Sequence, residues 1–382
     1  MRGLIQNFIC KLYVWTYFRH IYAENLPRDI RENLLILSHR NGAIDGFVYH
    51  SVLKKGVFLL ARQLQKNAFL RFLFPGIAVS RAKDTADKEQ SNTSSLRACL
   101  AVLRGDKEPL CLFPEGTSSL GPTHLPFHNG YAKMAQMNTA AGNRTDILPM
   151  AIIYDDPTKL GGSVWVIGGQ KISVSADMTA DDIGRQTLSE FEKITFSYSS
   201  VEAQQLAHQA AVLAALSKKM SYVTALNRIR ERADISDIVR QYHQKIPAGM
   251  LSYKGVKIYP QSVLQSVWVV GITIPIVVPT LLFNLIPILM GYLAGRTRLH
   301  DPNTISLWRG LVGYPAGALM YVVGLFCSPL WMGGAFLFSL WGLHLYGAFK
   351  KHTYALINWM LYRQGYSLFQ ESQYEIIKKL CS

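Results

Sequence analysis

Residues 34–45 read Leu-Leu-Ile-Leu-Ser-His-Arg-Asn-Gly-Ala-Ile-Asp, an apolar run followed by polar residues and a glycine. The apolar run 34–37 predicts a buried strand, and Asn-Gly at 41–42 is typical of a turn. His39 and Asp45 are too far apart in sequence to meet on one helix. They meet if His39 follows the strand and Asp45 lies in the first turn of the next helix. The carboxylate would then orient the imidazole, leaving its other nitrogen to act as a general base.

Two later apolar runs also end in residues suited to chemistry. Gly76–Val79 leads to Arg81, and an arginine in that place can hold a phosphate through two hydrogen bonds. Leu110–Leu112 leads to Phe113-Pro114-Glu115-Gly116-Thr117, where the glycine lets backbone amides approach an anion. Each pattern alone also fits an ordinary strand end with solvated side chains. Three of them in sequence indicate one site at the carboxyl ends of the strands.

Length and hydropathy predict several units in the chain. It has 382 residues, a net charge of +15 and 49% hydrophobic residues. In residues 25–175 apolar runs alternate with helical patterns, which predicts an α/β domain, a sheet flanked by helices. Residues 176–256 are polar and predict a helical subdomain. The positive charge accompanies long uncharged tracts, so it favours membrane lipids over nucleic acid as the anionic partner.

The C-terminal part of the chain predicts a membrane region at 257–349. No Asp, Glu, Lys or Arg occurs in 258–295 or in 311–349. As one helix, each tract would be about 57 Å long, nearly twice the roughly 30 Å of a bilayer core. Prolines and glycines interrupt both, so each tract is expected to form a transmembrane hairpin. Cations between and after the tracts then place the α/β domain and a tail, 350–382, on the cytosolic face.

Residues 1–24 predict an amphipathic helix in the membrane interface, with packing on the soluble core as the alternative. We expect no signal peptide, because Lys11 interrupts the apolar stretch and no cleavage site follows. The five scattered cysteines show no metal or disulfide spacing, so no metal is expected. Residues 46–83 contain no acidic residue, which predicts a surface for anionic lipid or an acyl carrier. Its seven basic residues are Lys54, Lys55, Arg62, Lys66, Arg71, Arg81 and Lys83.

Four sequence blocks together resemble the glycerolipid acyltransferase superfamily. They stand, in the family's order, at His39–Asp45, Gly76–Arg81, Phe113–Thr117 and Leu148–Met150. The resemblance implies an O-acyltransferase that moves a fatty acyl group from acyl-CoA or acyl carrier protein to a glycerolipid hydroxyl. It implies no metal, no cofactor and no acyl-enzyme.

The resemblance also implies a role for each residue of these blocks. His39 would deprotonate the acceptor hydroxyl, and Asp45 would orient and stabilise the imidazolium. The implied substrate-binding residues are Arg81, which would hold the acceptor phosphate, together with Asn41, Glu115, Gly116 and Thr117.

Departures from the common motifs leave the acceptor open. Five residues separate His39 from Asp45, where most members have four. This spacing resembles the yeast-type glycerol-3-phosphate and dihydroxyacetone-phosphate acyltransferases and their bacterial relatives. Ser118 and His128 stand where many members carry cations, so a lysophospholipid acceptor stays an alternative. A non-catalytic lipid-binding protein is a further alternative. A serine hydrolase is disfavoured, because the second glycine of Gly116–Gly121 comes one place too late for a nucleophile elbow.

Overall fold

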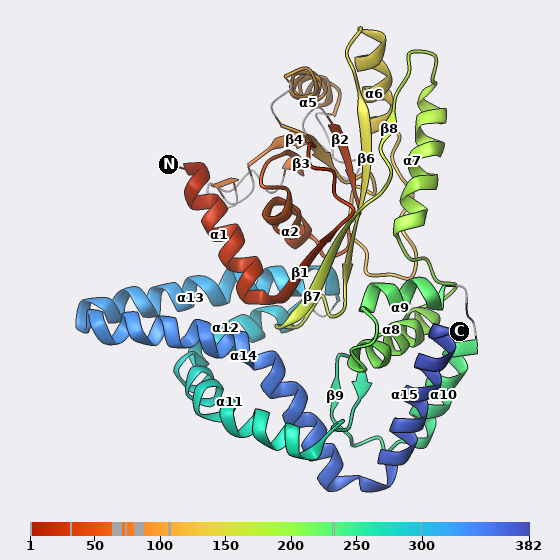
Figure 1. Cartoon of the computed structure of the whole chain (residues 1–382). Helices are drawn as coiled ribbons and strands as arrows, with labels where there is room; N and C mark the ends of the chain where they lie inside the picture. Colours follow the sequence, from red (N-terminus) through yellow and green to blue (C-terminus); the bar gives the residue numbers. More distant parts are fainter. Residues whose placement is uncertain are drawn as a thin grey trace. The chain divides into compact units, whose positions relative to one another are not determined.

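The computed structural model describes residues 2–30, 33–62, 71–72, 75–79, 88–105, 108–230, 232, 234–298 and 300–382 (Figure 1). The chain divides into two compact units. The first contains Met1–Trp15, Ile21–Ile153 and Val164–Ser197, and the second contains Thr16–His20, Tyr154–Ser163 and Tyr198–Ser382.

The first unit is built on a mainly parallel sheet, which confirms the predicted α/β class. Its strands are β1 (Phe18–Glu24), β2 (Asn33–Leu37), β3 (Val57–Ala61), β4 (Ile77–Val79), β5 (Leu110–Leu112), β6 (Asp146–Tyr154), β7 (Gly162–Gly168) and β8 (Ile172–Ser173). Their order is β1-β7-β6-β2-β5-β3-β4, with β8 beside β6. β2 runs parallel to both β5 and β6, and every residue of β2 is buried. A strand buried on both faces reads as a continuous apolar run, as 34–37 does.

Helices cover this sheet. They are α1 (Arg2–Tyr17), α2 (Ala43–Leu53), α5 (Lys88–Leu103), α6 (Gly130–Ala140) and α7 (Ala180–Ile194). Leu34 and Ile36 of β2 share one core with residues of α5, α6 and α7. Successive strand residues point to opposite faces, so Leu35 and Leu37 face the other side, where Figure 1 shows α2 and α1. The site is therefore supported by a strand that packs on both sides.

The N-terminal helix is shorter than predicted. It ends at Tyr17, and residues 18–24, expected to be helical, form strand β1. This segment is rich in aromatic and β-branched residues and lies beside β7, where the Tyr22 ring stacks 5.2 Å from that of Trp165. Tyr13 packs against Phe47 of α2 with ring centroids 5.6 Å apart. The buried side of α1 thus packs on the core, as in the alternative prediction, while Phe8 stays exposed.

The second unit contains most of the predicted helical subdomain. Its elements include α8 (Val201–Leu216), α9 (Tyr222–Ile229), α10 (Asp234–Lys245), β9 (Ser252–Tyr253) and β10 (Val256–Lys257). Residues 350–382 are not the tail that we expected. They complete α14 (Pro329–Leu361) and form α15 (Tyr366–Cys381), whose Gln373 Nε2 donates to the Leu213 carbonyl at 3.0 Å. Buried Phe369, Ile376 and Leu380, which lie on one face of α15, account for this docking.

Each apolar tract is divided into two helices, the second at the predicted Pro329 but the first away from the predicted Pro275 and Pro279. The first tract forms α11 (Val263–Phe283) and α12 (Leu285–Arg296), and prolines 275 and 279 lie inside α11. The division falls at Asn284. Its side-chain amide donates to the Thr280 carbonyl and so competes with the backbone hydrogen bonds of the helix. The second tract divides at Ser328, between α13 (Ile305–Cys327) and α14. A residue before proline is driven to extended backbone, and Ser328 has φ −158°.

The four helices pack mainly across the two tracts, α11 against α14 and α12 against α13. Thr280 of α11 lies directly against Gly342 of α14. Nearby, Asn284 Nδ2 donates to Ser339 Oγ at 2.8 Å, and the Tyr321 hydroxyl donates to Asn284 Oδ1 at 3.1 Å. Where the surroundings are as apolar as the helices themselves, the hydrophobic effect does not drive association. Helices then associate through small residues, which allow close approach, and through interhelical hydrogen bonds.

Gly342 provides a test of this packing. A Cβ atom at Gly342 would lie 2.6 Å from Thr280 Cβ, whereas one at Gly334 of the same helix meets nothing within 4 Å. We expect Gly342→Ala to destabilise the protein by about 2 kcal/mol through overpacking. The control Gly334→Ala should stabilise it by up to about 1 kcal/mol, because alanine favours the helix. Thermal unfolding of the detergent-purified chain measures both, and equal shifts would contradict the described packing.

Candidate active site

The site begins where β2 ends. The backbone amide of Ser38 donates to the Met150 carbonyl of β6 at 3.0 Å. The hydroxyl oxygen of Ser38 accepts a hydrogen bond from the backbone amide of Ile152 at 2.7 Å. Because these bonds continue the strand pairing past Leu37, the next residue, His39, is held at the carboxyl end of the sheet.

A glycine turn then starts α2. Gly42 is the N-cap and has φ +56° and ψ −143°, a backbone conformation that a side chain strongly disfavours. The Asn41 carbonyl accepts from the amide of Ile44, and the Gly42 carbonyl accepts from that of Asp45. This places Asp45 in the first turn of α2, where the helix dipole favours a negative charge.

Asp45 and His39 meet as the spacing predicts. Asp45 Oδ2 lies 3.0 Å from His39 Nδ1 and also accepts the backbone amides of Arg40 at 2.6 Å and Asn41 at 2.8 Å. The Asp45 side chain is fully buried, and His39 is 9% exposed. A carboxylate only accepts, so Nδ1 carries the proton and Nε2 of the neutral ring has a lone pair available for a substrate proton.

Aromatic residues wall the imidazole. The Phe113 ring, just beyond β5, stacks on His39 with centroids 4.4 Å apart and planes inclined by 28°. Tyr49 of α2 lies behind Phe113 at 6.0 Å, and its hydroxyl bonds to the Met150 carbonyl. Burial raises the pKa of Tyr49 well above its usual range, so it stays neutral at physiological pH. These rings limit the directions in which the imidazole can turn.

Glu115 connects the loops that follow β2 and β5. Its side chain is buried; Oε1 accepts the backbone amide of His39 at 2.9 Å, and Oε2 accepts that of Leu125 at 3.1 Å. The Ser119 amide in turn donates to the His39 carbonyl at 3.0 Å. In this structure Glu115 therefore positions the histidine backbone, and both of its oxygens are engaged by the protein. Contact with an acceptor, which the resemblance implies, stays a prediction.

The other predicted binding residues have different placements. Asn41 is fully buried and forms the turn. Gly116 has φ +67°, and a Cβ there would approach the His128 ring to 3.2 Å. Thr117 is half-buried beside it. Arg81 lies outside the described residues.

His124 is a neighbour of the site that the sequence did not reveal. Its Nδ1 lies 3.9 Å from Glu115 Oε1, and its ring meets Phe191 edge to face at 5.0 Å. No spacing to another motif distinguishes Thr123-His124-Leu125, so no local signal could have found it. Within the described part of the chain, no group of three or more His, Cys, Asp or Glu could hold a metal ion.

The structural role of Glu115 predicts a measurable effect on stability. Glu115→Ala leaves the buried amide of His39 and the half-buried amide of Leu125 without acceptors and should destabilise the first unit by about 3 kcal/mol. Hydrogen exchange at the amides of His39 and Leu125 should accelerate. The control Glu375→Ala removes an exposed carboxylate on α15 and should change neither quantity. Unchanged protection of both amides in Glu115→Ala would refute the role.

Comparison with known proteins identifies the domain. The family model described as Acyltransferase matches residues 18–153, which contain His39, Asp45 and Glu115. No curated protein matches the chain. Among solved structures, the chain is similar to the 1-acyl-sn-glycerophosphate (LPA) acyltransferase PlsC from Thermotoga maritima. The two share 16% sequence identity with a TM-score of 0.38, over 50% of this chain and 77% of that one. Residues 18–153 thus form an acyltransferase-family domain, as the four sequence blocks predict, and the chain is an acyltransferase.

Proposed function

We propose that the chain transfers a fatty acyl group from acyl-CoA or acyl carrier protein to the hydroxyl of a glycerol-3-phosphate-type acceptor. The observation that supports this most directly is the His39–Asp45 pair, with Nδ1 bonded to a buried carboxylate at 3.0 Å. An alcohol needs a general base to attack a thioester, and an oriented neutral imidazole supplies one at neutral pH.

The transfer would take place in one displacement. His39 Nε2 takes the proton of the acceptor hydroxyl while the hydroxyl oxygen bonds to the thioester carbonyl carbon. The tetrahedral intermediate then expels the thiolate, which receives the proton from the imidazolium. Asp45 stabilises the imidazolium during this step, because its carboxylate is buried and already bonded to Nδ1. Backbone amides near Gly116, at φ +67°, are suited to the developing oxyanion.

An anionic acceptor agrees with the charges of the first unit. Lys54, Lys55, Arg62 and Arg71 are all exposed among its described residues. Such a surface attracts phosphate groups and the anionic face of a membrane. Ser118 and His128, in place of the family's usual cations, leave the glycerol-phosphate and lysophospholipid acceptors to be separated by assay.

The first experiment measures acyl transfer by the purified chain with labelled acyl-CoA and a panel of acceptors. The panel contains glycerol-3-phosphate, dihydroxyacetone phosphate, lysophosphatidate and other lysophospholipids. His39→Ala should lower kcat by about 10³-fold, because the general base is lost. Asp45→Asn should lower both kcat and stability, because a neutral amide oxygen holds the three N–H donors more weakly.

His300→Ala, at an exposed position, is the matched control and should retain full activity. Full turnover by the His39→Ala variant would exclude His39 as the general base. An inactive wild type on every acceptor would favour the non-catalytic, lipid-binding alternative.

We further propose that the second unit inserts in the membrane. α11 and the segment Pro302–Cys327 are each long and apolar enough to cross a bilayer. Cations lie over aromatic rings near the start of α13 and at the end of the uncharged part of α14. Arg298 is 4.2 Å from the Trp308 ring centroid, and Lys350 is 5.9 Å from that of Tyr346. Aromatic residues beside cations are typical of the membrane interface. We place this end, and the acyltransferase domain, on the cytosolic side.

Cysteine labelling tests the topology. In a Cys381→Ser background, Asn303→Cys and the native, exposed Cys327 mark opposite ends of α13, about 34 Å apart at 1.5 Å per residue. With Cys327 also replaced by serine, Asn303→Cys should react with a membrane-impermeant maleimide only from the cytosolic side. Cys327 alone should react only from the other side. Labelling of both from one side would contradict a spanning α13.

A further inference from the structure

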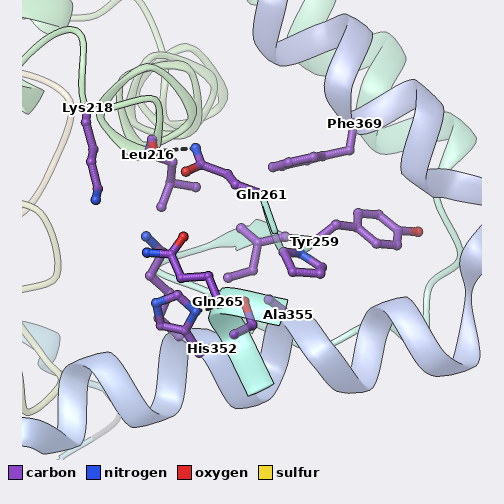
Figure 2. Close-up of a pocket in the computed structure, with 12 residues that line it drawn as sticks. Leu216, Lys218, Tyr259, Gln261, Gln265, His352, Ala355 and Phe369 are labelled. Carbon is purple, nitrogen blue, oxygen red and sulfur yellow. Dashed lines mark hydrogen bonds between the residues drawn. The ribbon is translucent and has the colours of Figure 1, made fainter. Parts of the chain in front are cut away.

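A pocket in the second unit is separate from the chemistry of His39. It is enclosed by the end of α8, the segment that enters α11, the first turn of α11, and parts of α14 and α15 (Figure 2). The lining residues are Leu216, Lys218, Ile258, Tyr259, Pro260, Gln261, Gln265, Ser266, Lys351, His352, Ala355 and Phe369. In Figure 2, Lys218, Gln265 and His352 occupy one end of the pocket and Phe369 the other. The pocket is therefore polar at one end and apolar at the other.

The polar end has positive charge and no carboxylate. Neither Lys218 nor Lys351 forms an ion pair with any described residue, and no acidic residue lines the pocket. Burial, and then the charges of Lys218 and Arg19, lower the pKa of Lys351 to about 8. Burial, and then the charges of Lys351 and Lys218, lower the pKa of His352 to about 4. Two lysines kept together without a counter-ion favour the binding of an anion.

Backbone and hydrogen-bond geometry hold these groups in place. Lys218 follows the end of α8 with φ +61°, a conformation more often given to glycine. His352 Nδ1 bonds to Ser266 Oγ at 2.9 Å, and Gln261 Nε2 donates to the Leu216 carbonyl at 2.6 Å. Ser262 caps α11, so the positive end of a 21-residue helix dipole lies beside the pocket.

The pocket lies where two apolar helices end. Ser266 of α11 is opposite His352 of α14, whereas Thr280 is opposite Gly342, so the two helices run antiparallel. The N-terminus of α11 and the end of the uncharged part of α14 are consequently on the same side. Just beyond the pocket, α11 exposes Leu264, Val267 and Trp268. If α11 crosses the bilayer, the pocket is at the depth of the lipid headgroups.

We propose that this pocket binds the phosphate of an anionic phospholipid, with its glycerol and first acyl carbons on the apolar side. The proposal rests on the membrane insertion of the second unit proposed above and is independent of the acyl-transfer reaction. A lipid fits better than a free phosphate, because the pocket joins two cations to Leu216, Tyr259 and Phe369 beside an exposed apolar helix.

Direct binding to the detergent-purified full chain tests the proposal. The probes are dihexanoyl phosphatidylglycerol, dihexanoyl phosphatidylcholine and inorganic phosphate, each titrated below its micellar concentration and measured by calorimetry. We expect phosphatidylglycerol to bind, and to bind at least 10-fold more tightly than either other probe. In Lys218→Gln/Lys351→Gln its affinity should fall at least 10-fold, whereas Lys218→Arg/Lys351→Arg should retain it.

Lys219→Gln is the matched control, because Lys219 is adjacent and exposed but does not line the pocket. It should bind phosphatidylglycerol as the wild type does. Equal affinities of the wild type and the double glutamine variant would overturn the proposal. Inorganic phosphate binding as tightly as the anionic lipid would overturn the lipid as the ligand. Because the readout is binding, an enzyme inactive on every acceptor would leave the result interpretable.

Discussion

The acyltransferase domain depends on one buried oxygen atom, Asp45 Oδ2. It accepts hydrogen bonds from His39 Nδ1 and from the backbone amides of Arg40 and Asn41. A buried carboxylate is costly unless its hydrogen-bonding capacity is used, and here the donors come from the segment that carries the imidazole. The conformation of the turn, the start of α2 and the orientation of His39 are thus coupled. Changing any one of them disturbs the charge that holds the others.

A second carboxylate, that of Glu115, connects the segment of His39 to the neighbouring strand. Glu115 follows β5 and accepts the amide of His39, which follows β2. Since β2 and β5 are parallel neighbours, their ends meet at one edge of the sheet, and a single side chain can connect their loops. The family motif that contains Glu115 therefore has a clear structural use in this chain. Its carboxylate holds the backbone of His39 beside the turn at Gly116.

Cationic side chains of the second unit have two kinds of surroundings. Lys254, in the β9–β10 turn, pairs with Asp155, whose other oxygen accepts the amide of Ser163 at 2.6 Å. Asn358 of α14 likewise satisfies backbone groups of Leu251 and Ile258. Near the start of α11, by contrast, Lys218 and Lys351 face a common pocket that no carboxylate lines. Unlike Lys254, these two lysines have no carboxylate partner among the described residues, which supports the proposed binding of an external anion.

The sequence by itself determined the α/β class, the strand at 34–37, the turn that brings His39 to Asp45, and the apolar tracts. These features follow from residue periodicity, turn chemistry and short spacings, all of which act within about a dozen residues. The sequence also identified the acyltransferase family, because four short blocks occur in order. Only the tertiary structure decided that residues 18–24 pair as a strand, that Glu115 holds the backbone of His39, and that α11 packs on α14. Each of these depends on contacts between distant segments, such as the 76 positions between His39 and Glu115, and local pattern carries no information about them.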